Sequence, residues 1–201
     1  MQKRSGYRKS EISRQQVLEA AIQVLGRKGF ASTSVQDIAE EAKLSKGAVH
    51  YHFASKDELI RCVLDQCCDA LVSDARKIWE TDTAPIERIR RSIASLWESR
   101  RRRLEFRVLL DLMAQGLHDK ALVPPVAAML QQKRAEMLKE IKAVLEASGL
   151  RPKVDPEVFP HLVLGIIDGL AIHNHFDPLT PAAEVELFKA LDLVFAAFFT
   201  F

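Results

Sequence analysis

The chain has 201 residues, of which 48% are hydrophobic and 28% are charged, with only 8 glycines and 8 prolines. This composition is typical of a folded globular protein and excludes collagen-like, disordered and disulfide-built chains. The longest uncharged apolar stretches, 162–167 and 193–201, fall short of the roughly 18 residues that a membrane-spanning helix needs. The basic amino-terminal segment has no apolar stretch behind it and does not read as a secretory signal. We therefore expect a cytoplasmic protein.

Charge is distributed unevenly along the chain. Residues 1–56 carry ten Lys or Arg and five Asp or Glu, a balance of +5, although the whole chain is only +2. The rest of the chain therefore has a balance of −3. This asymmetry is expected when one end of a protein meets a polyanion. The three cysteines, at positions 62, 67 and 68, fit neither a disulfide framework nor a zinc-ligand spacing, and we expect thiols.

Apolar residues recur at steps of three and four along nearly the whole chain, which predicts an all-α fold. The segments before residue 55 are short and basic, and those after it are long and apolar. We expect a three-helix head in residues 1–55 and a helical bundle in residues 56–201. Cap residues and periodicity place about nine helices in the ranges 10–28, 34–42, 45–52, 55–80, 83–101, 104–117, 121–148, 156–175 and 181–200.

Residues 30–59 read FASTSVQDIAEEAKLSKGAVHYHFASKDEL. Two short helices joined by a tight connection at Lys43 and Leu44 predict a helix-turn-helix unit at about 34–52, with the first helix packed behind both. The segments TSVQDIAEEA, LSKGAVHYHF and SKDEL resemble the amino-terminal signature of the tetracycline-repressor (TetR) family over about 50 residues. Family members usually carry an aromatic residue where this chain has His50. Here the aromatic residue is the adjacent Tyr51, so the base preference stays open.

The resemblance implies a DNA-binding head and a carboxy-terminal domain for effector binding and dimerisation. The implied function is that of a transcriptional regulator, more often a repressor, which a small molecule releases from its operator. Two alternatives stay open: a constitutive DNA-binding protein without an effector, and an all-helical carrier or enzyme. The sequence has no Gly-rich phosphate loop, nucleophile elbow or HExxH motif, so we expect no enzymatic activity and no cofactor.

The predicted DNA-binding residues lie at helix caps and on exposed helix sides. Thr33 or Ser34 can cap the helix at about 34–42. Ser45 caps a helix whose first amides can bind phosphate, and the small Gly47 and Ala48 let the backbone approach the groove. The resemblance assigns His52 and Lys56 to the DNA backbone. The full set is Thr33, Ser34, Ser45, Lys46, Gly47, Ala48, His50, Tyr51, His52 and Lys56, with Lys46, His50 and Tyr51 as the exposed readers of the bases.

The last two predicted helices are apolar on two sides, more than a single chain needs to cover. The segment IIDGLAIHNHFDP also looks like the "DGL" segment of the penultimate helix in TetR-family regulators. We therefore expect a four-helix dimer interface between two copies of the chain. An alternative is that both stripes belong to the chain's own core. The predicted interface residues are Phe159, Leu162, Gly165, Ile166, Gly169, Phe188, Leu191, Phe195 and Phe198.

Polar residues on an apolar helix need partners or a ligand. Asp168 and His175 share one helix face, and they favour a satisfied hydrogen-bond network, a pair that crosses the dimer, or an effector contact. His173 and His175 point about 200° apart on a helix, so we expect no metal site. The arginines at 100–103 are expected to form a solvated face. The candidate effector-binding residues are Trp97, Phe106, Leu110, Met113, Asp168 and His175, of which the aromatic and Met residues could equally be core.

Overall fold

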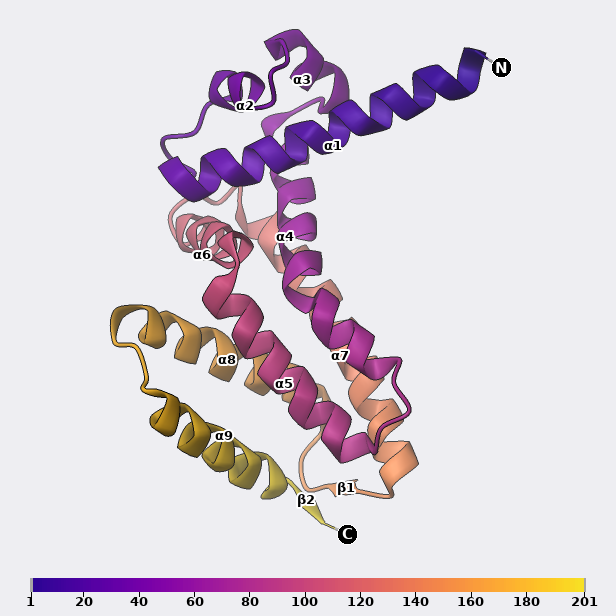
Figure 1. Cartoon of the computed structure of the whole chain (residues 1–201), viewed down its shortest axis with the longest axis vertical. Coiled ribbons are helices and arrows are strands. Elements are labelled where there is room, and N and C mark those ends of the chain that lie inside the picture. The colour runs from indigo at the N-terminus through magenta and orange to yellow at the C-terminus, as the bar shows by residue number, and fades with distance from the viewer. Residues whose placement is uncertain (1, 201) are drawn as a thin grey trace. The chain divides into compact units, whose positions relative to one another are not determined.

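The structure of the protein is a computed structural model that describes residues 2–200, and for residues 2–10 and Pro85 it describes the backbone only. Within residues 2–200 the all-α prediction is confirmed (Figure 1). The nine α-helices are α1 (Gln2–Lys28), α2 (Val35–Glu41), α3 (Lys46–His52), α4 (Lys56–Trp79), α5 (Pro85–Arg102), α6 (Leu104–Gly116), α7 (Val123–Ser148), α8 (Phe159–Phe176) and α9 (Pro181–Ala196).

Three helix boundaries differ from the prediction by three residues or more, at the start of α1, the start of α8 and the end of α9. Helix α1 begins at Gln2, about two turns earlier than expected from the apolar pattern. Helix α9 ends at Ala196 instead of near residue 200, because β2 (Phe199–Thr200) pairs antiparallel with β1 (Arg151–Pro152). A single 3-10 turn, η1 (Pro156–Val158), precedes α8. None of the described helices combines the length and apolar character needed to span a membrane.

The chain divides into two compact units. The first contains the residues up to Ala70 together with Arg103–Leu130, and the second contains Leu71–Arg102 together with the residues from Gln131 onward. The first unit therefore includes α1–α3, the first part of α4, and α6. The functional boundary at residue 55 stays a prediction.

Helix α6 belongs to the first unit because it packs closely against α1. A Cβ atom at Gly26 would overlap the side chain of Leu104, so glycine permits this approach of the two helices. Arg107 Nη2 donates to the Gly26 carbonyl oxygen at 3.2 Å. Just beyond α1, the Phe30 backbone N–H donates to Asp111 Oδ2 at 2.6 Å. The carboxy-terminal end of α1 is thus held by α6 through packing and hydrogen bonds.

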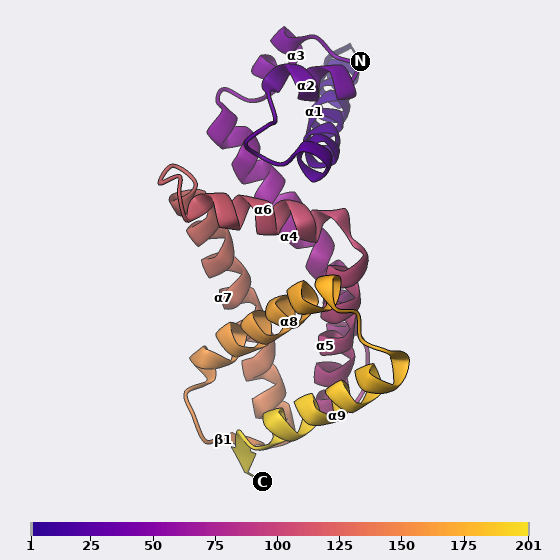
Figure 2. The ribbon, with the colours of Figure 1, turned by 90° about the vertical axis from the view of Figure 1, so that its left-hand side faces the viewer.

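The core of the second unit forms where α5 and α8 pack together, with α9 beside them (Figure 2). Polar contacts add to this packing. Trp97 Nε1 donates to Glu184 Oε1 at 3.0 Å, and Arg101 Nη1 donates to Glu184 Oε2 at 2.6 Å. The buried core residues are Ala75, Ile93, Leu96, Val163, Ile167 and Leu191.

The prediction of a solvated arginine face is wrong for Arg100. Its side chain is only 4% exposed, and Arg100 Nε donates to Asp168 Oδ1 on α8. Arg102, by contrast, is 76% exposed and pairs with Glu98 on its own helix. The two side chains differ because Arg100 lies on the side of α5 that packs against α8, whereas Arg102 faces solvent.

Candidate nucleic-acid interface

A short turn fixes the direction of α3 relative to α2. Lys43 has φ = +55°, a left-handed conformation that is uncommon for a residue other than glycine. The Leu44 backbone N–H donates to the Ala39 carbonyl oxygen at 2.9 Å and closes the turn. This confirms the tight connection predicted at these two residues. The helix-turn-helix geometry therefore lies in residues 35–52, and α1 packs against both of its helices (Figure 1).

Helix α3 is capped at its start and anchored on one side. Ser45 Oγ accepts the Ala48 backbone N–H at 3.1 Å, as expected for an N-cap. Val49 and Phe53 are buried and hold α3 and its carboxy-terminal end on the head. The guanidinium of Arg14 on α1 lies over the Phe53 ring, 4.9 Å from its centre. One side of α3 is therefore fixed to the head, which leaves the opposite side available to a partner.

The available side carries the residues predicted to read bases. Lys46, His50 and Tyr51 are all exposed, and the Tyr51 side chain is 78% exposed. Gly47 is also exposed, and the only atom near a Cβ built there would be Ser45 Oγ at 3.7 Å. Lysine donates hydrogen bonds, and histidine and tyrosine can both donate and accept them. The major groove of DNA is wide enough to admit an α-helix that carries these side chains.

The second predicted cap is provided by Ser34 and not by Thr33. Ser34 Oγ accepts the Asp37 backbone N–H at 3.2 Å, while Asp37 Oδ2 accepts the Ser34 backbone N–H at 2.9 Å. These reciprocal bonds form a capping box at the start of α2. The hydroxyl of Thr33 is buried and donates to the Gly29 carbonyl oxygen at 2.6 Å. The Thr33 hydroxyl is thus engaged in a hydrogen bond inside the head, and Ser34 carries the exposed hydroxyl at the start of this helix.

His52 and Lys56, which the resemblance assigned to the DNA backbone, also have contacts inside the head. His52 Nε2 lies 2.6 Å from Ser13 Oγ on α1. The Lys56 ammonium lies over the ring of Phe30, 4.3 Å from its centre. These contacts fix the His52 side chain at the end of α3 and the Lys56 side chain at the start of α4. Their contact with phosphate stays a prediction.

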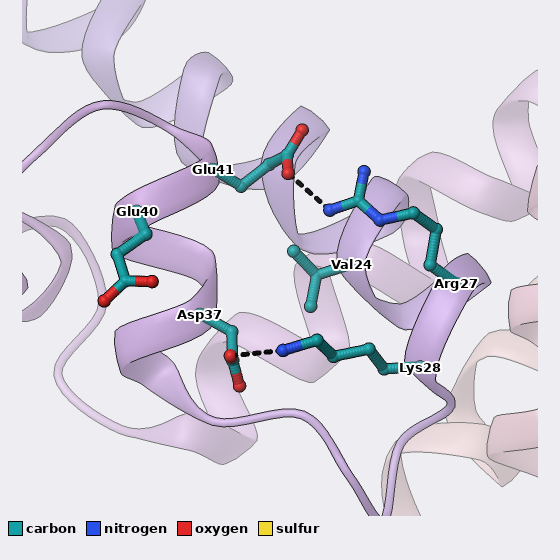
Figure 3. Close-up of a pocket in the computed structure, with 6 residues that line it drawn as sticks. All are labelled: Val24, Arg27, Lys28, Asp37, Glu40 and Glu41. Atoms are coloured by element: carbon teal, nitrogen blue, oxygen red, sulfur yellow. Dashed lines mark hydrogen bonds and ion pairs between the residues drawn. The ribbon is translucent and has the colours of Figure 1, made fainter.

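Two ion pairs join α1 to α2 across an open surface pocket (Figure 3). Arg27 pairs with Glu41, and Lys28 Nζ lies 2.5 Å from Asp37 Oδ1. The hydrogen bonds from Lys28 and then from Ser34 hold the pKa of Asp37 well below its usual range. The hydrogen bond from Arg27 lowers the pKa of Glu41. Two of the three acidic groups of α2 are therefore paired with cations of α1, which limits their repulsion of a polyanion.

We expect Asp37→Ala to destabilise the head more at neutral pH than in acid. Because the folded-state pKa of Asp37 is lowered, its contribution to stability is fully present above the unfolded-state pKa of about 4 and is lost progressively as the pH falls from there through the folded-state pKa. The difference in melting temperature between the variant and the wild type should therefore be largest at pH 7 and should shrink steadily below about pH 4, with part of it still present at pH 3. Glu40→Ala is the control, because it removes the same charge from α2 but no bond to α1. Equal effects of the two substitutions at pH 7 would contradict the prediction.

The predicted effector-binding residues are divided between the two units. Phe106, Leu110 and Met113 lie in the first unit, and Trp97, Asp168 and His175 lie in the second. The Asp168 carboxylate accepts a bond from Arg100, and the Trp97 N–H is bonded to Glu184. His175 is exposed and its ring lies against Phe176. Asp168 thus has the partner that the hydrogen-bond interpretation requires, and the effector pocket stays a prediction.

The predicted dimer residues fall into two groups. Phe159 and Leu191 are buried in the chain's own core, where Phe159 packs against Phe198 and Phe199. Six more are half-buried, whereas Gly165 is exposed; nothing lies within 4 Å of a Cβ built at Gly165 or Gly169. The half-buried residues are Leu162, Ile166, Gly169, Phe188, Phe195 and Phe198.

The structure adds exposed apolar residues that the sequence analysis missed. On α8, Ile172 and Phe176 follow Gly165 and Gly169 at helical spacing, so these four share one stripe, which is exposed except at the half-buried Gly169. On α9, the exposed apolar residues are Val185, Leu193 and Val194, and Leu193 is 74% exposed. Helical register groups these residues on one side of each helix, but only their exposure in the structure separates that side from the buried stripe.

Among the described residues, no group of His, Cys, Asp and Glu side chains could hold a metal ion. His173 and His175 are both exposed at the end of α8. The arrangement at α2 and α3 offers hydrogen-bond donors and a capped helix, which suit recognition of a polyanion.

Two family models match the chain. Residues 17–63 match "Bacterial regulatory proteins, tetR family", and residues 85–191 match "BetI-type transcriptional repressor, C-terminal". The first match contains the helix-turn-helix, and the second covers more than half of the chain. Together they span α2, α3 and most of the second unit.

Similar proteins agree with these matches. The nicotine-responsive transcriptional repressor HdnoR of Paenarthrobacter nicotinovorans is 28% identical over 170 residues, which are 84% of this chain and 86% of HdnoR. The uncharacterised regulator YuxN of Bacillus subtilis is 34% identical over 83 residues, but the match spans only 28% of YuxN and 41% of this chain.

A solved structure shows the same fold. A TetR transcription regulator from Haloarcula marismortui superimposes with a TM-score of 0.74 at 21% identity, over 94% of this chain and 100% of that one. The relatives named here are transcriptional regulators. The family models match both the helix-turn-helix, with its capped α3, and residues 85–191. The chain therefore belongs to the TetR family of helix-turn-helix transcriptional regulators, whose members bind DNA operators and act as dimers.

Proposed function

We propose that this chain acts as a homodimeric repressor that a small-molecule effector releases from its operator. The observation that supports the proposal most strongly is the geometry of α3. Val49 and Phe53 fix one side of the helix to the head, while Lys46, His50 and Tyr51 project from the other. An α-helix held in this way can enter the major groove and present its side chains to base edges.

Dimerisation is supported by the exposed apolar stripes of α8 and α9. Ile172, Phe176 and Leu193 are exposed apolar side chains that a second copy of the chain would cover. The open glycines at 165 and 169 allow two helix backbones to approach closely. A two-fold dimer places two α3 helices on one DNA, so the operator is a near-palindrome with half-sites about one helical turn apart.

An effector is supported by the relatives. HdnoR is a nicotine-responsive repressor, and its match includes most of the second unit. The effector-contacting residues that we propose within the second unit are Trp97, Asp168 and His175. A ligand changes the affinity for DNA only by binding one dimer conformation more tightly than the other. We place the protein in the cytoplasm, and the proposed function requires no catalytic activity.

The proposal is tested by selecting duplexes from a random-sequence DNA library with the purified full chain. Enrichment of an inverted repeat whose half-sites lie about 10 base pairs apart supports it. Failure to enrich any sequence overturns it. A constitutive DNA-binding protein would enrich a sequence as well, but no small molecule from a metabolite collection would release it. Release by one compound therefore separates the two functions.

We expect Tyr51→Ala to weaken binding to the selected operator by about 1–3 kcal/mol without changing the melting temperature. The Tyr51 side chain is 78% exposed and contacts the edge of the His52 ring, so its removal leaves the core intact. Titration of labelled operator gives the affinity, and Tyr51→Phe shows how much the hydroxyl contributes. A lower melting temperature, or unchanged affinity, would show that Tyr51 does not read DNA.

A further inference from the structure

The positive charge of the head is concentrated in its first 14 residues. Residues 1–14 contain five Lys or Arg and one Glu, a balance of +4, whereas residues 15–56 contain five Lys or Arg and four Asp or Glu, a balance of +1. In the second segment, Arg27 and Lys28 are already paired with Glu41 and Asp37. The helix-turn-helix itself is thus nearly neutral. DNA affinity depends on cations that neutralise phosphates. Most of the head's cations that are available for this lie outside α2 and α3.

The segment that carries this charge continues α1 as a helix beyond the packed part of the head. Helix α1 begins at Gln2, and Val17 is the first buried side chain among those described. Glu11 and Ile12 are exposed. Residues 2–12, which we call the basic arm, extend over about 16 Å at the usual rise of a helix.

The basic arm leaves the head beside the carboxy-terminal end of α3. The next residue, Ser13, lies 2.6 Å from His52 Nε2, and Arg14 lies over the ring of Phe53. Tyr51, a predicted base reader, contacts the His52 ring. The arm therefore starts within one residue of a contact to the helix that reads DNA, and Figure 1 shows α1 continuing past α3.

The sequence of the arm disfavours a helix in isolation. Its first turn contains Lys3 and Arg4 and no acidic residue, so the cations oppose the helix dipole. Gly6 further lowers helix propensity. A polyanion beside the arm offsets the unfavourable interaction of these cations with the helix dipole. Binding of the polyanion and helix formation therefore favour each other.

We propose that the basic arm binds the phosphate backbone of DNA next to the base pairs that α3 reads. The inference rests on the proposed DNA-binding function and adds a second, sequence-independent contact to it. Cations on phosphates strengthen binding to every sequence alike, whereas α3 provides the discrimination. The arm thus supplies most of the salt-dependent affinity of the protein.

The test uses the full chain and a random-sequence duplex of about 30 base pairs, which measures the electrostatic contribution alone. The arm variant replaces Lys3, Arg4, Arg8 and Lys9 with Gln. We expect its affinity in about 0.1 M salt to fall at least tenfold, and the slope of log K against log salt to decrease by at least about 3 for the dimer. The matched control replaces four exposed lysines outside the arm and outside α8 and α9, namely Lys77, Lys120, Lys139 and Lys142.

Each outcome decides a separate question. If the wild type binds no duplex, the proposed function fails; if it binds and the arm variant equals the four-lysine control, the arm proposal alone fails. Gly6→Ala keeps every charge and strengthens the helix, so it should tighten binding by up to about fivefold. Weaker binding by Gly6→Ala would overturn the helical arm. Binding to phosphatidylserine-containing vesicles but not to DNA, with loss in the arm variant, would assign the arm to a membrane and overturn the proposal.

Discussion

Leu193→Glu is expected to dissociate the dimer and to reduce affinity for operator DNA at least about a hundredfold, although Leu193 lies far from α3 in sequence. Leu193 is 74% exposed on α9, so the chain's own fold does not require it. In a dimer seam the new carboxylate loses water without gaining a partner, which costs several kcal/mol. Two separate heads must then bind their half-sites independently, and the gain in effective concentration is lost.

The control for this substitution is Leu117→Glu. Leu117 is 83% exposed at the end of α6, so this substitution introduces the same charge at an exposed position outside α8 and α9. Sedimentation and operator titration of both variants give the mass and the affinity. If Leu193→Glu remains dimeric and binds like Leu117→Glu, the seam lies elsewhere in the chain.

The structure also explains why Leu193 is a sharper test than residues chosen from the apolar pattern. Ile166 and Phe195 are half-buried and pack against the core of the second unit, so a charge at either position would damage the fold as well as the dimer. Periodicity identifies which helix faces are apolar. It does not distinguish the face covered by the same chain from the face left for a second copy.

The head could be predicted closely because its determinants are local. Ser34 and Ser45 cap the helices to which the sequence assigned them, and Lys43 and Leu44 form the expected turn. A cap depends on a side chain and a backbone group three residues apart, so the sequence contains both partners. Thr33 shows the limit: its bond to the Gly29 carbonyl, only four residues back, spans the turn after α1, where Gly29 has φ = +75°, and no cap pattern predicts it.

Features that depend on distant residues were missed. The early start of α1 lies outside the apolar pattern, and the pairing of β1 with β2 joins residues about 50 positions apart. The run of arginines at 100–103 has the composition of a solvated surface, yet Arg100 is buried against Asp168, 68 residues further along. Charge alone could not reveal that partner.

Arg100 accordingly gives the largest expected effect on stability. Replacing it with Met removes the cation and leaves the carboxylate of Asp168 in the interface between α5 and α8, which costs about 3 kcal/mol in the free energy of unfolding. Urea denaturation measures this loss. Arg102→Met is the matched control, because Arg102 is 76% exposed and its pair with Glu98 contributes at most about 1 kcal/mol.

A second substitution separates the ion pair from the packing of the arginine side chain. If the loss comes from an unpaired carboxylate, Arg100→Met combined with Asp168→Leu should recover most of the stability, because two apolar side chains leave no charge without a partner. If the loss comes from packing, the double variant should be at least as unstable as Arg100→Met alone. Because α8 carries the exposed stripe with Gly165, Gly169 and Ile172, recovery of stability should restore dimerisation and DNA binding together. Recovered stability with a chain that stays monomeric would show that Arg100 and Asp168 are needed to position α8 for its partner, beyond holding it to α5.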